Sequence, residues 1–254
     1  MKRPVTHFAL AALAVLFTIQ SCAPKNYLAG SELSQYRIDG VDDPAPDRRI
    51  DSIIAPYRAK LSAVMDEVLG EVAVSMDKAL PAGGLNNWFA DALLRSSEAI
   101  FGQPADVAVQ NYGGLRINSL GAGPLTRGKV YELMPFENMT ALLVLDSARV
   151  QAVCDDMAKF GGGVVSSSLQ FGIDGDVARD IRIRGEALRG DRQYRFMFPD
   201  YVVNGGDVGR IVAGAPREDS PLLIREALFM ELERLRAAGE KVVGRPDGRI
   251  YFIN

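Results

Sequence analysis

The sequence predicts one α+β domain with a mixed or antiparallel sheet, spanning residues 50–254, behind an export signal and a polar tether. Three observations lead to this class. Apolar periodicities of the helical and the strand type are interleaved along residues 50–254. Short turns join several of the strand-like runs, which favours antiparallel pairing. No internal repeat, low-complexity stretch or second linker divides these residues, so a single core of this size is expected.

The first residues are predicted to be an export signal rather than part of the fold. An apolar run over residues 8–19 follows Lys2 and Arg3, which is the layout of a secretory signal, and it is too short to span a bilayer. The polar, turn-rich residues 22–49 then form a tether from the membrane to the domain, with a possible short strand only over 33–38.

The sequence Gln20-Ser21-Cys22 predicts the cleavage site of a bacterial lipoprotein signal, with 1–21 removed and Cys22 as the lipidated first residue. Diacylglycerol and an amide-linked chain on Cys22 would supply the two anchors that stable attachment needs. We therefore expect a membrane-anchored lipoprotein of the cell envelope, in the outer membrane on its periplasmic or surface face. The alternative is a simple secretory signal in which Cys22 is incidental.

Apolar residues at helical spacing predict two helices in the first half of the domain. The first runs for about five turns over residues 50–69 and ends at Gly70. The second has its apolar face over residues 85–100, and Asn86 or Asn87 is a candidate cap. Strands are expected at residues 71–76 and 105–110.

The second half alternates strands with helices after a short helix that Thr126 caps and Pro135 stops. A closing hairpin is expected around the turn Pro246-Asp247-Gly248. The predicted strands are 140–145, 169–173, 178–184 and 193–198, the predicted helices are 147–160 and 221–238, and the hairpin joins 241–244 to 249–253.

Charge and residue usage exclude several classes of function. Removal of Lys2 and Arg3 with the signal leaves 27 of the 29 basic residues against 32 acidic ones, and a net charge of −5 argues against a nucleic-acid partner. The only histidine, His7, leaves with the signal. A Ser-His-Asp or Cys-His site would therefore have no base, and a two-metal phosphoesterase site would lack imidazole ligands. We expect no catalytic residue, metal site or cofactor in this chain.

The second cysteine, Cys154, falls on the apolar stripe of the helix predicted over residues 147–160. A buried small hydrophobic side chain is the expected role, rather than a nucleophile. With Cys22 committed to lipid, no disulfide is expected.

Four short segments are polar or glycine-rich where a purely structural role explains them poorly: residues 87–92, 111–116, 135–138 and 201–207. Each follows or opens a regular element, which is where binding loops tend to lie. In the second segment, Gly113 and Gly114 let the backbone approach a ligand closely, and Arg116 supplies donors for hydroxyls or phosphate oxygens.

The last two segments offer flat aromatic faces and a ribose ligand. Phe136 follows a proline that directs the backbone, and Tyr201 offers a second ring on which a base could stack. Asp207 follows Gly205 and Gly206 in a turn and could accept two ribose hydroxyls.

Each segment has a structural alternative. Residues 111–116 could be a strand-ending turn with a solvated Arg116, Phe136 could be a core aromatic, and residues 204–207 could be only a tight turn. The order and spacing of the four segments together favour a binding site.

Together these motifs resemble the C-terminal, substrate-binding domain of the 5'-nucleotidase family, which includes bacterial UDP-sugar hydrolases and animal ecto-5'-nucleotidases. The resemblance runs from about Ile50 to Asn254. The family pattern is Gly-Asn-x-x-x-Asp-Ala, Asn-x-Gly-Gly-[Ile/Val/Leu]-Arg, Gly-x-[Ile/Leu]-Thr with Pro-Phe-x-Asn, and aromatic-x-x-Asn-Gly-Gly-Asp. The matching residues here are 86–92, 111–116, 123–126 with 135–138, and 201–207.

The resemblance implies a four-layer α/β/β/α domain that holds a nucleobase between the rings of Phe136 and Tyr201. It also implies that Asn111 contacts the base, Arg116 the ribose or phosphate, and Asp207 the ribose hydroxyls. The substrate-binding residues implied in this way are Asn111, Gly113, Gly114, Arg116, Phe136, Tyr201, Asn204, Gly206 and Asp207.

Two departures from the family pattern bear on function. Full-length members carry an N-terminal metallophosphoesterase domain with two metals, and the residues before Ile50 are too few to hold one. The family's Arg-x-x-Glu-like segment is Pro81-Ala82-Gly83-Gly84 here, so a phosphate-side cation is missing.

We therefore expect the nucleoside- or nucleotide-binding half of a split 5'-nucleotidase, whose partner is a separately encoded metallophosphoesterase that carries the divalent metals. The alternatives are a non-enzymatic lipoprotein that binds nucleosides or nucleotide sugars for scavenging, and a structural domain whose loops are relics.

Overall fold

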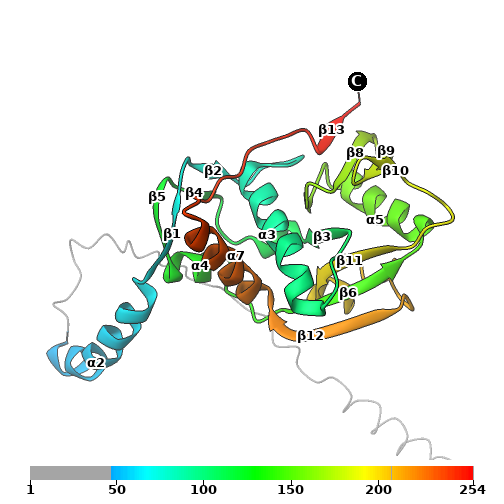
Figure 1. Ribbon diagram of the computed structural model, residues 1–254. Coiled ribbons are helices and arrows are strands. Elements are labelled where there is room, and N and C mark those ends of the chain that lie inside the picture. The colour runs from blue at the N-terminus through cyan, green and yellow to red at the C-terminus, as the bar shows by residue number, and fades with distance from the viewer. Residues whose placement is uncertain (1–46, 207, 254) are drawn as a thin grey trace, which may run out of the picture. The chain divides into compact units, whose positions relative to one another are not determined.

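The computed structural model describes residues 47–206 and 208–253 of the chain (Figure 1). The chain divides after residue 51, and the architecture below is that of the unit formed by residues 52–254. The predicted signal, Cys22, most of the tether and the strand considered at 33–38 lie outside the described residues.

The elements alternate along the chain as the apolar periodicity predicts. The first half holds α2 (Arg48–Met65), β1 (Val68–Val72), β2 (Met76–Asp77), α3 (Gly84–Phe101), β3 (Val107–Gln110), β4 (Ser119–Leu120), β5 (Gly123–Thr126), α4 (Arg127–Leu133) and β6 (Met139–Leu145). The second half holds α5 (Ser147–Lys159), β7 (Val164–Val165), β8 (Leu169–Asp174), β9 (Val177–Ile183), β10 (Glu186–Ala187), β11 (Tyr194–Pro199), α6 (Asp200–Val203), β12 (Arg217–Leu223), α7 (Ile224–Ala238) and β13 (Ile250–Phe252).

Two larger sheets organise the domain, and both are mixed. The five-stranded sheet has the order β12-β6-β11-β3-β7, in which β11 and β3 are parallel and the other pairs antiparallel. The four-stranded sheet has the order β10-β9-β8-β13, with β13 parallel to β8. Two-stranded pairs β1-β5 and β2-β4 complete the fold. The predicted α+β class with mixed sheets is confirmed.

Two hydrophobic cores pack against opposite faces of the five-stranded sheet. Helices α3 and α7 pack together on one face, where Leu142 and Met197 of the sheet join their core. On the other face, Leu143 and Phe196 pack with α5 and with the apolar face of the four-stranded sheet. Burial on both faces explains why β6 reads as a nearly continuous apolar run.

Several local expectations are confirmed. Cys154 is buried in the second core, and this desolvation raises the pKa of its thiol well above the usual range, so it is not a nucleophile. Thr126 caps α4, because its hydroxyl accepts a hydrogen bond from the backbone N–H of Lys129 at 3.3 Å. Helix α4 ends at Leu133, two residues before Pro135.

Two expectations about the first half are wrong. The first helix ends at Met65, because Val68 and Gly70 pair with β5 in a strand rather than extending the helix. The cap of α3 is Gly83 rather than Asn86 or Asn87. The amide of Asn86 instead bonds the backbone of Ala79, where it fixes the preceding loop.

The end of the chain also departs from expectation. Residues 221–223 belong to β12 and not to the last helix, which starts at Ile224, where the Glu226 carboxylate accepts from the N–H of Leu223 at 2.7 Å. The closing hairpin does not form. Val242 forms a bridge with Val72, and β13 pairs with β8. The two halves of the predicted hairpin therefore pair with two different strands and not with each other. Within residues 47–206 and 208–253, no helix is long and apolar enough to cross a membrane.

Candidate functional site

A cavity of about 300 Å³ opens beside the turn that follows β3. Polar groups of Gln110, Asn111 and Asp156 meet a mainly apolar wall there. A concave apolar site with a few polar groups is the usual form of a small-molecule site. Its wall is completed by Leu80, Val109, Tyr112, Gly113, Met157, Phe160, Gly162, Gly163, Val202 and Val208.

The turn after β3 presents Asn111 and Gly113 to this cavity. Strand β3 ends at Gln110, and a 3-10 helix follows over Tyr112–Gly114. Gly114 packs closely against two side-chain amides, because a Cβ there would lie 2.6 Å from the Asn111 Oδ1 atom and 2.7 Å from the Gln110 Nε2 atom and would displace them. Gly113 faces open space, since a Cβ there would have the Asn111 Nδ2 atom, 3.8 Å away, as its nearest neighbour. The two predicted glycines therefore have different roles, one in packing and one at the cavity wall.

A close backbone contact shapes the opposite part of the wall. Gly162 has φ +137°, and a Cβ there would lie 2.2 Å from the carbonyl oxygen of Pro81. The N–H of Gly163 donates to the same oxygen at 3.0 Å. The loop containing Leu80 is thereby held against the end of α5, and together they line the cavity.

Two cations lie near each other beside the Asn111 turn. The Lys78 Nζ atom lies 4.0 Å from the centre of the Tyr112 ring and donates to the Leu115 carbonyl at 2.8 Å. Burial and the positive charge of Arg116 both lower the pKa of Lys78. Arg116 is exposed and donates to the Gly113 carbonyl at 3.4 Å. Among the described residues, neither cation forms an ion pair with a carboxylate.

The loop after β11 reaches the cavity through Val202 and Val208, which flank the predicted ribose-binding turn. Gly206 donates its N–H to the Tyr201 carbonyl at 3.2 Å and closes the loop. The Asn204 Oδ1 atom accepts from Arg217 at 2.6 Å, so this amide oxygen is engaged within the protein. Asp207 lies outside the described residues.

Of the two predicted stacking rings, Phe136 lies in the loop before β6 and Tyr201 in the short helix α6. Phe136 is 39% exposed and Tyr201 is 56% exposed, so neither is a core aromatic. A hydrogen bond of 3.3 Å from Asn138 to Asp200 joins this loop to α6. Arg116 lies 5.5 Å from the centre of the Phe136 ring. The ring pairs found among the described residues do not join Phe136 to Tyr201, and a base held between them stays a prediction.

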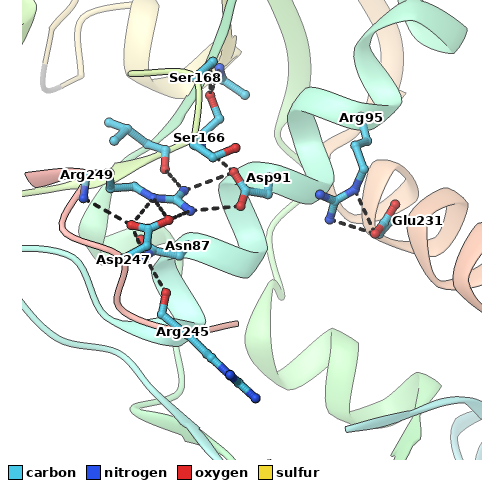
Figure 2. A network of polar contacts seen from close by, with 12 residues as sticks. Asn87, Asp91, Arg95, Ser166, Ser168, Glu231, Arg245, Asp247 and Arg249 are labelled. Carbon is cyan, nitrogen blue, oxygen red and sulfur yellow. Dashed lines mark hydrogen bonds and ion pairs between the residues drawn. The ribbon is translucent and has the colours of Figure 1, made fainter. Parts of the chain in front are cut away.

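The polar residues of the first predicted segment, 87–92, hold the fold together. Figure 2 shows Asp91 facing Arg249, whose guanidinium also pairs with Asp247. Asn87 donates to the Arg245 carbonyl at 2.9 Å. These contacts fasten the C-terminal segment to α3 and engage the Asp91 carboxylate and the Asn87 side-chain N–H groups, whereas the buried Asn87 Oδ1 atom has no hydrogen-bond partner among the described residues.

Sequence reasoning missed Lys78 and Phe160. Phe160 caps the C-terminal end of α5, is 69% exposed and lines the cavity. In the sequence, Phe160 is an apolar residue at the end of a predicted helix, directly before three glycines. Lys78 carried no motif signal, because only the path of the loop brings it to Tyr112. Within the part of the chain that the structure describes, no three His, Cys, Asp or Glu residues gather where they could hold a metal ion.

Comparison with known proteins finds a family model that covers most of these segments. A family model described as the 5'-nucleotidase C-terminal domain matches residues 68–213, which is more than half of the chain. The match includes the Asn111 turn, both predicted rings and the loop after β11.

Three proteins similar to this chain are longer than it. A 5'-nucleotidase precursor from Thermus thermophilus is 25% identical, with a TM-score of 0.68 over 82% of this chain and 44% of that chain. A Staphylococcus aureus protein described as a candidate 5'-nucleotidase, solved with α-ketoglutarate, shares the fold at a TM-score of 0.65 and 17% identity, over 83% of this chain and 45% of that one. Endonuclease YhcR of Bacillus subtilis is 22% identical over 213 residues, which are 81% of this chain and 17% of that protein. The chain thus spans less than half the length of each relative.

Proposed function

The chain belongs to the 5'-nucleotidase C-terminal domain family, and on this premise we propose that it binds a nucleotide as the substrate-binding part of a 5'-nucleotidase-like system. The observation that carries the proposal is the cavity at the Asn111 turn with two cations beside it that no described carboxylate neutralises. An apolar hollow suits a base, and adjacent positive charge suits a phosphate.

The base is the part of the ligand for which an apolar wall and an amide are suited. The Asn111 amide can both donate and accept hydrogen bonds at a base edge. Phe136 and Tyr201 are exposed on two segments that a hydrogen bond joins and would stack on the base, and Asp207 would accept from the ribose hydroxyls. Gly113, Gly114, Asn204 and Gly206 shape the two turns around it.

The phosphate would meet Lys78 and Arg116. The family's Arg-x-x-Glu-like segment is Pro81-Ala82-Gly83-Gly84 in this chain, and Lys78 supplies a positive charge three residues before it. The two cations raise each other's electrostatic energy, and an anion between them would relieve this repulsion. This favours a nucleotide over a free nucleoside as the ligand.

The proposed role of the cavity in binding can be tested with a substitution whose side chain fills it. Calorimetry should show AMP binding to the wild-type chain, and Gly113→Leu should abolish it, since Gly113 lines the cavity and has a backbone that accepts a side chain. The matched control is Gly190→Leu, at an exposed glycine with no atom within 4 Å of a Cβ. Equal AMP binding by both variants and the wild type would contradict the proposed site.

Hydrolysis would require a partner that holds divalent metals, and we propose a separately encoded metallophosphoesterase. The residues after position 21 include no histidine, which is the ligand that such sites commonly use. The purified chain supplied with Mn²⁺ should therefore not hydrolyse AMP. A metal-dependent turnover of about 1 s⁻¹ or faster that survives rigorous purification would contradict this.

We also propose that Cys22 carries lipid and holds the domain at the cell envelope, as the signal-like residues 1–21 indicate. A fatty-acid analogue should label the wild-type chain and should not label Cys22→Ser. Unchanged labelling and unchanged membrane fractionation of Cys22→Ser would show that this assignment is wrong.

A further inference from the structure

Helix α2 exposes a row of large apolar side chains that no described residue covers. Tyr57 is 73% exposed, Ile53 60% and Leu61 58%, and none of the residues of α2 is buried. Contiguous exposed apolar groups of this kind mark an interaction surface. We define the apolar face of α2 as Ile53, Ile54, Tyr57, Leu61 and Val64.

Basic side chains border this face on both sides. At 3.6 residues per turn, the five apolar residues fall within an arc of about 100°. Lys60 lies about 20° beyond the Ile53 edge, and Arg58 about 40° beyond the Ile54 edge. The far side of the helix carries small residues, among them Ala59 and Ala63. Long basic side chains at the borders of an apolar arc can keep their charges at the headgroup level while the arc is buried.

The charge of α2 is opposite to that of the chain as a whole. Residues 48–65 include the bases Arg48, Arg49, Arg58 and Lys60 and a single acid, Asp51, whereas the whole chain has a net charge of −3. We propose that α2 binds the surface of an anionic membrane, with its apolar face in the boundary between headgroups and acyl chains. A basic, amphipathic helix of low overall hydrophobicity is the type that lies in this plane.

A second copy of the helix would be a poorer partner. The apolar residues do repeat at spacings of three and four, as in a helical pair. However, residues 52–65 contain no acidic side chain, so Arg58 and Lys60 would meet only like or neutral groups across such a seam. Anionic headgroups supply the charge that another copy of this helix lacks.

Flotation with lipid vesicles tests the proposal without depending on Cys22. The chain from residue 22 carrying Cys22→Ser has neither a lipid nor the apolar run of residues 8–19, which would bind vesicles by itself. It should float with vesicles of phosphatidylcholine and phosphatidylglycerol in equal parts and much less with phosphatidylcholine alone, and high salt should weaken its binding.

Substitutions separate the apolar and the charge contributions. Ile53→Ser with Leu61→Ser should lower the partition coefficient by more than about tenfold, because two large side chains no longer enter the apolar region. Lys60→Gln should lower it by about fivefold on the mixed vesicles only. Ala59→Ser with Ala63→Ser, on the far side of the helix, is the matched control and should bind as the unsubstituted chain does. Because the substituted positions are exposed, these variants should be as stable as the unsubstituted chain, which thermal unfolding would verify.

Three results would overturn the proposal. One is an equal affinity for neutral and mixed vesicles, and another is unchanged flotation of the Ile53→Ser, Leu61→Ser variant. The third is a doubled molecular mass in sedimentation equilibrium that this variant abolishes, since a second copy would then cover the face.

Discussion

Two regions of the molecule differ in whether their positively charged side chains have carboxylate partners. In one, the Arg249 side chain is 5% exposed, forms ion pairs with Asp91 and Asp247, and donates to the Val165 carbonyl at 2.7 Å (Figure 2). In the other, Lys78 and Arg116 lie beside the cavity with aromatic rings and carbonyls as partners and no described carboxylate.

The difference separates residues that hold the fold from residues available to a ligand. A buried cation with two carboxylates is already neutralised, and removing it would leave those carboxylates unpaired. Two cations without counter-charge gain from any anion that arrives. Asp91 and Arg116 both lie in segments that stand out in the sequence, yet only Arg116 has no carboxylate partner among the described residues.

The largest effect is expected at the paired region. Arg249→Met should lower the free energy of unfolding by about 3 kcal/mol, because Asp91 loses its ion-pair partner in a largely buried position. Urea unfolding measures this. Arg179→Met, which breaks an exposed pair with Asp174, should cost about 0.5 kcal/mol or less. Equal stability of the two variants would show that the Arg249 network does not stabilise the fold as its contacts indicate.

A smaller effect, on binding rather than stability, is expected at the unpaired region. Lys78→Gln should weaken AMP binding by about 2 kcal/mol through the loss of a charged hydrogen bond, and should leave adenosine binding nearly unchanged. Calorimetry with both ligands measures the contrast. Lys241→Gln removes an exposed lysine that pairs with Glu71 and serves as the control. Equal losses of binding affinity for AMP and adenosine would show that Lys78 does not contact the phosphate.

The aromatic residues should contribute about as much or slightly less. Tyr201→Ala and Phe136→Ala should each weaken nucleoside binding by about 1–2 kcal/mol if both rings stack on the base. Phe160→Ala tests the cavity wall in the same assay, because Phe160 is an exposed ring that lines it. A loss confined to Phe160→Ala would place the base deeper in the cavity and away from the Phe136–Tyr201 pair.

The smallest effect is the pH dependence of the paired region. Burial raises the pKa of Asp247, but the hydrogen bond and charge of Arg249 lower it by more, so it lies below its usual value. Its stabilising contribution is present above the ordinary pKa of an aspartate, about 4, and is lost as pH falls through the lowered pKa. Since Asp247 is 44% exposed, we expect less than about 1 kcal/mol.

Urea unfolding measured from about pH 5 downward, through and below the ordinary aspartate pKa of about 4, tests this contribution. The wild-type chain should lose stability more steeply than Asp247→Asn, whose amide cannot titrate. Parallel curves for the two proteins would show that Arg249 does not act through the charge of Asp247.

Some parts of the site were open to prediction and others were not. The Asn111 turn and the loop after β11 could be predicted, because glycines and polar residues that follow a strand mark such loops locally. Lys78 and Phe160 could not, since the packing of other elements brings Lys78 to the Tyr112 ring and Phe160 to the cavity wall. Helix α2 was predicted as amphipathic, but its periodicity does not say that the apolar face stays uncovered.

By itself the sequence determined the α+β class, the apolar faces of α3 and α5, the cap at Thr126 and the burial of Cys154. These depend on periodicity and on contacts within a few residues. Only the tertiary structure decided that residues 221–223 belong to β12 and that the C-terminal residues join β1 and β8. A strand takes its hydrogen bonds from another part of the chain, so its partner is chosen by which sheet edge is left open and not by its own residues.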